Sequence, residues 1–150
     1  MSKPRVYIAA PLFNEAERKF NEILANALRA SVDVYLPQSD GILLEDAISR
    51  GEDPSQASKG VFAADIGALR KCDALLIVLN GRTIDEGAAF ELGVAWSLGK
   101  RCIGYKNDPR QLLAAGDNPM IVQAVSDILC SLKDVEKWGH SLRKDYDWFV

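Results

Sequence analysis

The sequence contains only one histidine and three cysteines, and it has no hydrophobic run long enough to span a membrane. The single histidine, His140, excludes a multi-histidine metal site and makes a Ser-His-Asp triad untenable. The cysteines are isolated, odd in number and without a Cys-x-x-Cys pair, which favours reduced thiols. The chain enters its first strand without an apolar signal segment. We therefore expect a cytoplasmic protein without a metal, a cofactor or a membrane partner.

Positive charge is also scarce, since the 150 residues carry a formal net charge of −3. A nucleic-acid-binding protein would usually show a basic patch, so we expect no nucleic-acid partner. Neither a Walker A motif nor a Gly-x-Gly-x-x-Gly motif follows the first strand, which argues against a loop that cradles phosphates. The apolar fraction of 48% is ordinary for a globular protein, and the length suits one domain over residues 1–150.

Apolar runs of strand length alternate along the chain with segments of helical periodicity. The expected strands cover residues 5–10, 32–36, 74–79, 101–105 and 127–132, and the expected helices cover 15–30, 42–50, 60–71, 87–98 and 132–144. This alternation predicts an α/β fold with helices on both faces of a doubly wound, mostly parallel, five-stranded sheet. Residues 38–41 are expected to form a turn, and the polar segment 51–60 a loop that covers a site. The aromatic tail, 145–150, is expected to pack on this chain or on a neighbour.

The most informative stretch is residues 80–100, where a polar loop follows the buried strand at 74–79 and leads into a helix. Glu91 is the only charged residue in the helical part, so the apolar pattern predicts a buried helix that carries a buried carboxylate. Side chains on a helix lean toward its N-terminus, and Gly87, one turn earlier, leaves open space for this carboxylate. Because Asp85 lies on the loop just before, we expect a pocket with two carboxylates at the carboxyl edge of the sheet, the usual ligand position in open α/β folds. A structural ion pair between Glu91 and a distant Lys or Arg is the alternative.

Phe62, Ile66 and Leu69 form the expected core stripe of the helix 60–71, and a third acid, Asp65, shares this side and should reach the same cleft. Paired carboxylates suit glycosidic-bond chemistry, in which one attacks or stabilises the anomeric carbon while the other exchanges a proton with the leaving group. A helix N-terminus helps Glu91 to stay ionised, and an apolar neighbourhood raises the pKa of Asp65, as an acid requires. A doubly wound domain that only binds its ligand is the non-catalytic alternative.

Four pieces of the sequence occur in a recognisable order. They are Val-Tyr7-Ile-Ala-Ala-Pro at the first strand, Asp65 before the third strand, Asp85-x-Gly87-x-x-x-Glu91-x-Gly93-x-Ala95-x-x-x-Gly99-Lys100, and Asn118-Pro-Met120 after the fourth strand. Together they resemble the nucleoside 2-deoxyribosyltransferases over residues 7–126. The resemblance implies a flavodoxin-like fold and an enzyme of nucleoside salvage that exchanges a 2-deoxyribosyl group between a deoxynucleoside and a free nucleobase.

The resemblance also implies roles for the acids. Glu91 matches the nucleophile that forms a covalent ester at C1′, so that two displacements give net retention. Asp65 matches the carboxyl that protonates the departing base and deprotonates the incoming one, and Asp85 matches the acid that anchors the sugar hydroxyls. Gly87 leaves room for the substrate. Tyr7 matches a tyrosine that orients the nucleophile, the alternative being that it is only a core residue of the first strand.

Three further residues match substrate-binding positions. Asn118 and Met120 match residues that reach the 5′-hydroxyl of a neighbouring subunit's substrate, and Gln38, at the end of the second strand, is placed to read the base edge. The resemblance thus implies a homo-oligomer, either a dimer or a hexamer built from dimers. The apolar side chains of Phe90, Val94 and Trp96 would suit its interface.

A second branch of the superfamily hydrolyses the N-glycosidic bond of nucleoside 5′-monophosphates. Such an enzyme needs phosphate donors near the first loop, but residues 9–13, Ala-Ala-Pro-Leu-Phe, contain no Ser, Thr or Arg, and Pro11 lacks an N–H. The segment 118–120 suits a neutral hydroxyl instead. We therefore expect a transferase, with the monophosphate hydrolase as the alternative.

Overall fold

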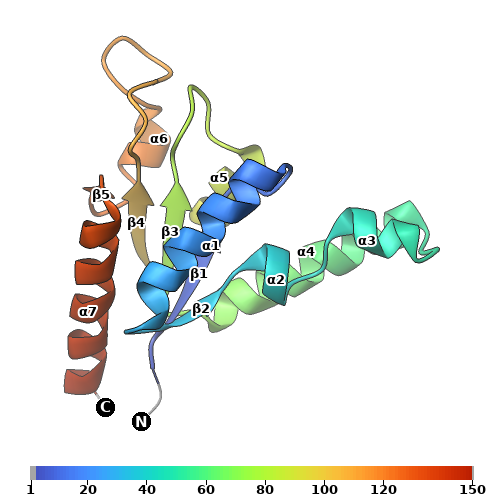
Figure 1. Ribbon diagram of the computed structural model, residues 1–150, viewed down its shortest axis with the longest axis horizontal. Helices are drawn as coiled ribbons and strands as arrows, with labels where there is room; N and C mark the ends of the chain where they lie inside the picture. The colour runs from blue at the N-terminus through green and yellow to red at the C-terminus, as the bar shows by residue number, and fades with distance from the viewer. Residues whose placement is uncertain (1–2, 150) are drawn as a thin grey trace.

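The computed structural model describes residues 3–149, with side chains as far as Asp145, and it contains one five-stranded sheet (Figure 1). The strands are β1 (Arg5–Ala9), β2 (Asp33–Tyr35), β3 (Ala74–Val78), β4 (Arg101–Tyr105) and β5 (Ile128–Leu129). They lie in the order β2-β1-β3-β4-β5, with every neighbouring pair parallel. This is the strand order of flavodoxin-like folds. The predicted doubly wound α/β fold is confirmed, and its sheet is wholly parallel within the described residues.

Helices cover both faces of the sheet. They are α1 (Glu15–Arg29) and α7 (Leu132–Phe149) on one face, α4 (Pro54–Lys71) and α5 (Glu86–Ser97) on the other, and the short α2 (Pro37–Asp40), α3 (Leu44–Ser49) and α6 (Pro119–Val122) in the connections. Successive strand residues face opposite sides, so Val6 and Ile8 enter the core beneath α1 and α7, whereas Tyr7 and Ala9 enter the core beneath α4 and α5. This alternation places Tyr7 on the side of the sheet that carries Asp65 and Glu91.

Helix α4 begins at Pro54, six residues before its predicted start, so the prediction of a polar loop over residues 51–60 is wrong beyond Asp53. The Asp53 side chain accepts hydrogen bonds from the N–H groups of Ser55 and Gln56, at 3.1 Å each, and proline occupies the first turn. Both features start a helix. In Figure 1, α3 and the first half of α4 project away from the sheet.

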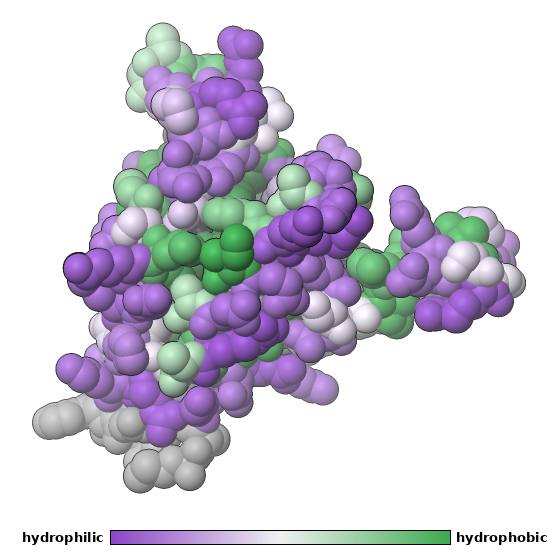
Figure 2. Space-filling view, in the orientation of Figure 1, coloured by the Kyte–Doolittle hydropathy of each residue, from purple (hydrophilic) through white to green (hydrophobic). Residues whose placement is uncertain are grey.

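The projecting segment carries apolar side chains that the chain itself leaves exposed. Phe62, predicted to lie in the core, is 59% exposed, because the sheet does not extend beneath this part of α4. The other large apolar side chains exposed in this segment are Leu44 and Ile48, and Ile42 is exposed just before α3. Figure 2 shows the corresponding hydrophobic surface among polar residues on the projecting segment.

Helix α5 is buried on one face only, so the prediction of a helix buried all round is wrong for the single chain. Ala88, Leu92 and Ala95 pack against the sheet, whereas Phe90 is 54% and Trp96 is 62% exposed. Helix α5 therefore has two apolar faces, and only one of them is buried within this chain.

Smaller differences concern the connections and the ends. Residues 38–41, predicted to form a turn, lie mostly in the single helical turn of α2. The aromatic side chains predicted to pack in the tail lie outside the described side chains. The three cysteines are free thiols, two of them buried. None of the helices within residues 3–149 is both long and apolar enough to cross a bilayer.

Candidate active site

Glu91 lies on α5, at the carboxyl edge of the sheet, and is held by a tyrosine from β1. The helix starts after Asp85, whose carboxylate accepts a hydrogen bond from the Ala88 N–H at 2.8 Å. The hydroxyl of Tyr7 donates to Glu91 Oε1 at 2.6 Å, a length typical of a hydrogen bond to a carboxylate. Tyr7 has no exposed surface, so this contact fixes the orientation of the Glu91 carboxyl from below.

The surroundings of Glu91 favour its neutral form more than water does. Its pKa is raised to about 7, first by burial and then by the carboxylates of Asp65 and Asp85, whereas the Tyr7 hydrogen bond lowers it. None of the ion pairs among the residues with described side chains includes Glu91, so the structural ion pair has no cationic partner there. Glu91 is therefore a carboxyl that gains or loses its proton near neutral pH.

Asp65, on α4, lines the same cavity as Glu91. The cavity has a volume of about 240 Å³ and is lined by Leu44, Ser58, Val61, Phe62, Asp65, Ile66, Gly87, Phe90 and Glu91. Burial raises the pKa of Asp65 to about 6, while the Tyr35 hydroxyl lowers it. Two carboxyls that titrate close to neutral pH thus face one largely apolar cavity, whose described lining contains no Lys or Arg.

Two residues beside Asp65 escaped the sequence reasoning. Tyr35, at the end of β2, is the parallel partner of Tyr7 in β1, and their rings stack with centroids 5.3 Å apart. Gly41 lies against the Tyr35 hydroxyl and the Asp65 carboxyl. A Cβ at this position would be 3.0 Å from the Tyr35 hydroxyl and 3.1 Å from Asp65 Oδ1. The sequence signal was the occurrence of one tyrosine in each of two neighbouring strands.

The remaining predicted residues on this side of the molecule have structural partners. Gly87 lines the cavity, and a Cβ there would lie 3.2 Å from Asp85 Oδ2, so glycine lets the capping carboxylate approach. The Gln38 side chain donates to the Arg18 carbonyl at 2.9 Å and accepts from the Asn21 amide at 3.0 Å. These two bonds fix the orientation of the Gln38 amide and leave it one N–H donor and one acceptor lone pair.

Asn118 and Met120 lie away from the Glu91 cavity. The Asn118 side chain caps α6 by accepting a hydrogen bond from the Met120 N–H at 2.9 Å, and Met120 is 80% exposed. Asn118 lines a separate cavity of about 220 Å³. Within one chain, these two residues are therefore not brought together with the carboxyls.

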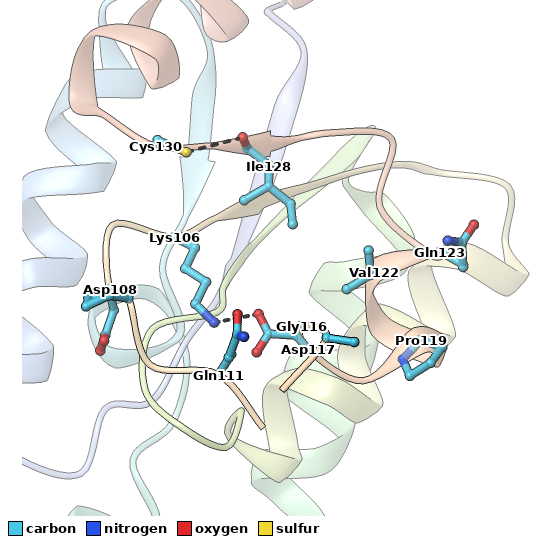
Figure 3. A pocket seen from close by; sticks show the side chains of 12 residues that line it. Lys106, Asp108, Gln111, Gly116, Asp117, Pro119, Val122, Gln123, Ile128 and Cys130 are labelled. Carbon is cyan, nitrogen blue, oxygen red and sulfur yellow. Dashed lines mark hydrogen bonds and ion pairs between the residues drawn. The ribbon is translucent and has the colours of Figure 1, made fainter. Parts of the chain in front are cut away.

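A larger cavity, of about 530 Å³, opens beside α6 near the ends of β4 and β5 (Figure 3). Lys106 and Asp117 pair within it at 2.5 Å, and their side chains are only 12% and 11% exposed. Each charge neutralises the other, so the pair ties the loop 106–117 to the end of β4. None of the predicted carboxyls lines this cavity.

Comparisons with known proteins found one matching family and several similar structures. A model of a family described as nucleoside 2-deoxyribosyltransferase matches residues 6–141. Among solved structures, a conserved protein from Enterococcus faecalis V583 is 26% identical with a TM-score of 0.78, covering 93% of this chain and 99% of its own. A 2-deoxyribosyltransferase from Bacillus psychrosaccharolyticus is 23% identical with a TM-score of 0.71, covering 88% and 90%. A CMP N-glycosidase from Clostridium botulinum is 21% identical with a TM-score of 0.49, covering 89% and 97%. No curated protein matches the sequence.

Proposed function

The chain belongs to the nucleoside 2-deoxyribosyltransferase family, and from this premise we propose that it transfers a 2-deoxyribosyl group between nucleobases, with Glu91 as the nucleophile. The family acts on N-glycosidic bonds by transfer or hydrolysis. The observation that carries the proposal is the Tyr7–Glu91 hydrogen bond of 2.6 Å in a cavity that Asp65 also lines.

The proposed reaction consists of two displacements at C1′ of the sugar. In the first, a Glu91 oxygen forms an ester bond to C1′ while the bond from C1′ to the base nitrogen breaks and Asp65 gives its proton to the base. In the second, a nitrogen of the incoming base attacks C1′, the ester bond breaks, and Asp65 takes up the proton of that base. Each displacement inverts C1′, so the product keeps the original configuration. Asp85 would anchor the sugar hydroxyls.

This cycle starts with Glu91 ionised and Asp65 protonated. The pKa values of about 7 and about 6 place both carboxyls within a narrow range, so near neutral pH the pair holds one proton that either carboxyl can carry. Positive charge that develops at C1′ favours the arrangement with Glu91 ionised, because that carboxyl lies against the sugar. The Tyr7 hydroxyl supports the same arrangement, since its hydrogen bond stabilises the ionised form of Glu91.

The entrance to α1 supports a neutral nucleoside as the substrate in preference to a nucleotide. The Glu17 carboxylate accepts hydrogen bonds from the N–H groups of Phe13 and Asn14, at 2.8 and 3.2 Å. The Glu17 carboxylate thus takes two N–H groups that lie just before the first turn of α1 and that a phosphate bound there could otherwise use. The nearby Arg18 guanidinium donates to the Leu12 carbonyl at 3.0 Å. A phosphate dianion at this position would therefore meet the charge of the Glu17 carboxylate, which disfavours a nucleotide.

We extend the proposal to a homo-oligomer in which Asn118 and Met120 complete a neighbour's site. The exposed side chains of Phe90, Trp96 and Met120 support this arrangement, because each would bury apolar surface against another copy. Sedimentation should show at least a dimer. Co-expression of Glu91→Gln with Asn118→Ala subunits should restore part of the activity that each variant lacks alone, because some mixed sites would contain both native residues.

The activity test is an incubation of the protein with 2′-deoxyinosine, with and without adenine or cytosine, followed by chromatography. A new deoxynucleoside that forms only with added base is the expected result. Glu91→Gln should abolish it, whereas Glu86→Gln, on the exposed side of the first turn of α5, should not.

Other results would overturn the proposal. Release of hypoxanthine at a rate independent of added base would indicate a hydrolase, to be tested next with deoxynucleoside monophosphates. Binding of nucleosides without any bond cleavage, unchanged in Glu91→Gln, would indicate the non-catalytic binding domain.

A further inference from the structure

The two carboxyls of the cavity are each faced by one of two stacked tyrosines. Tyr7 and Tyr35 are partners in the parallel register of β1 and β2, and their rings are inclined by 22°. Tyr7 donates to Glu91, while Tyr35 is directed at Asp65 and lowers its pKa. The arrangement therefore pairs a tyrosine from a strand with an acid from a helix twice, side by side.

Asp65 has one oxygen that the described structure leaves without a full hydrogen bond. Oδ1 has no contact with solvent and no partner at hydrogen-bond geometry. The Tyr35 hydroxyl lies beside it, against the same side of Gly41, where a Cβ would come within 3.1 Å of both oxygens. A buried oxygen without a donor is costly, and the Tyr35 hydroxyl is the neighbouring group placed to supply one.

We propose that Tyr35 is the positioning residue of Asp65: its hydroxyl donates to Oδ1 and so keeps the transferable proton on Oδ2, the oxygen that remains for the cavity. This inference rests on the proposed function of Asp65 as the acid. When Oδ1 accepts a hydrogen bond from the Tyr35 hydroxyl, the carboxyl proton of Asp65 is favoured on the other oxygen, Oδ2. The proton of Asp65 is therefore held on the side where a departing base can take it, and an incoming base returns its proton to the same oxygen.

The groups that face Asp65 come from three elements. Tyr35 of β2 opposes the effect of burial, while Glu91 of α5 and Tyr7 of β1 are close enough for their protonation to be coupled to that of Asp65. No cation acts on the Asp65 pKa among the described residues. Tyr35 is therefore the one neighbour identified as stabilising the ionised form of Asp65.

Tyr35 itself remains a donor at neutral pH. Burial, with the carboxylates of Asp65 and Asp40, raises its pKa to about 12, while Arg5 lowers it. The Arg5 guanidinium lies 5.5 Å from the centroid of the ring, and the Asp40 carboxylate accepts a hydrogen bond from the Leu36 N–H. The Tyr35 hydroxyl thus keeps its proton over the whole range in which Asp65 titrates.

The direct test is the titration of Asp65 in the substrate-free protein, followed by NMR with carboxyl-labelled aspartate and assigned with Asp65→Asn. Tyr35→Phe keeps the ring stacked on Tyr7 and removes only the hydroxyl. The loss of the Tyr35 hydroxyl should raise the Asp65 pKa by about one unit or more, because the ionised carboxylate loses a hydrogen bond. Tyr105→Phe is the matched control, since Tyr105 is also buried but belongs to the core on the other face of the sheet. An unchanged titration in Tyr35→Phe, or an equal shift in Tyr105→Phe, would overturn the inference.

Kinetics provide a readout that a purely structural role would not change. In Tyr35→Phe, kcat for transfer should fall about tenfold with little change in KM, and the pH profile should move to higher pH with the Asp65 pKa. An NMR shift in a protein that cleaves no nucleoside would refute the proposed function and leave the Tyr35–Asp65 contact standing. Transfer activity with an unchanged titration would refute the contact alone.

A reciprocal measurement covers the case in which Tyr35→Phe does not fold. Asp65→Asn removes one of the charges that raise the Tyr35 pKa, so the phenolate absorbance that develops near pH 12 should appear at lower pH. The absence of any such change would contradict the proposed contact.

Discussion

Replacement of Glu91 by glutamine should stabilise the protein in alkaline solution while abolishing its activity. Glutamine has nearly the same shape and retains an oxygen that can accept the hydrogen bond of 2.6 Å from the Tyr7 hydroxyl. It removes the charge that burial, Asp65 and Asp85 all disfavour. The substitution therefore isolates the cost of ionising one carboxyl in this cavity.

The magnitude follows from the difference between the pKa of Glu91 and its ordinary value. The pKa rises from 4.5 to about 7 on folding, and each unit corresponds to about 1.4 kcal/mol, so an ionised Glu91 costs about 3 kcal/mol of stability. Below pH 4.5 the carboxyl is neutral in both states, and no cost arises. Between pH 4.5 and 7 the unfolded chain ionises first, so stability falls as the pH rises. Above pH 7 the whole cost remains.

Urea denaturation at one protein concentration should reveal this pattern. Glu91→Gln should raise the free energy of unfolding by about 3 kcal/mol at pH 8 and by less than about 1 kcal/mol at pH 5. A fixed concentration is needed because association also changes apparent stability. Glu86→Gln, on the same helix but exposed, is the control and should change stability by less than about 0.5 kcal/mol. Destabilisation by Glu91→Gln at pH 8 would show that the carboxylate has a cationic partner, and the reasoning would fail.

Three other outcomes are expected. The rate of transfer should follow a bell-shaped pH profile centred between about 6 and about 7, because activity needs one proton shared by Asp65 and Glu91; a profile flat from pH 5 to 8 would contradict this. Gly41→Ala should lower the free energy of unfolding by about 1–3 kcal/mol, because its Cβ would lie 2.7 Å from a backbone oxygen, whereas Gly60→Ala, with open space in α4, should be neutral or stabilising in the same urea titration. Asp53→Ala should cost about 1 kcal/mol and increase amide exchange in the first turn of α4, and unchanged exchange would argue against the cap.

The sequence predicted the parts of the fold that depend on local pattern. The alternation of strands and helices was sufficient for the parallel sheet, and the isolated charge of Glu91 in an apolar helix indicated a residue that lines a cavity. The start of α4 was also encoded locally, in the Asp53–Pro54 pair, but the polar composition of residues 51–60 was interpreted as a loop. A helix-capping residue predicts a helix start better than polar composition predicts a loop, because the cap accepts hydrogen bonds from specific N–H groups of the first turn.

Other features depended on contacts between distant segments. Apolar periodicity shows which face of a helix avoids water and not what covers that face, so Phe62 and the outer face of α5 were assigned to a core that this chain does not provide. The role of Tyr35 depends on its register with Tyr7, which a single strand pattern does not determine. The partners of Gln38 lie on α1, and nothing in the local sequence indicates them.

The hydrogen bond between Tyr7 and Glu91 joins residues 84 positions apart in the chain. Strands β1 and β3, which bring the two residues together, pair in parallel and cannot form as a local hairpin. During synthesis, the acid and its tyrosine remain separate until α5 has left the ribosome and docked on the sheet. Contacts of such long range are costly in loop entropy and form late in folding. The Tyr7–Glu91 contact therefore requires β1 and β3 to be joined, and the titration of Glu91 would report the joining of the two halves of the sheet.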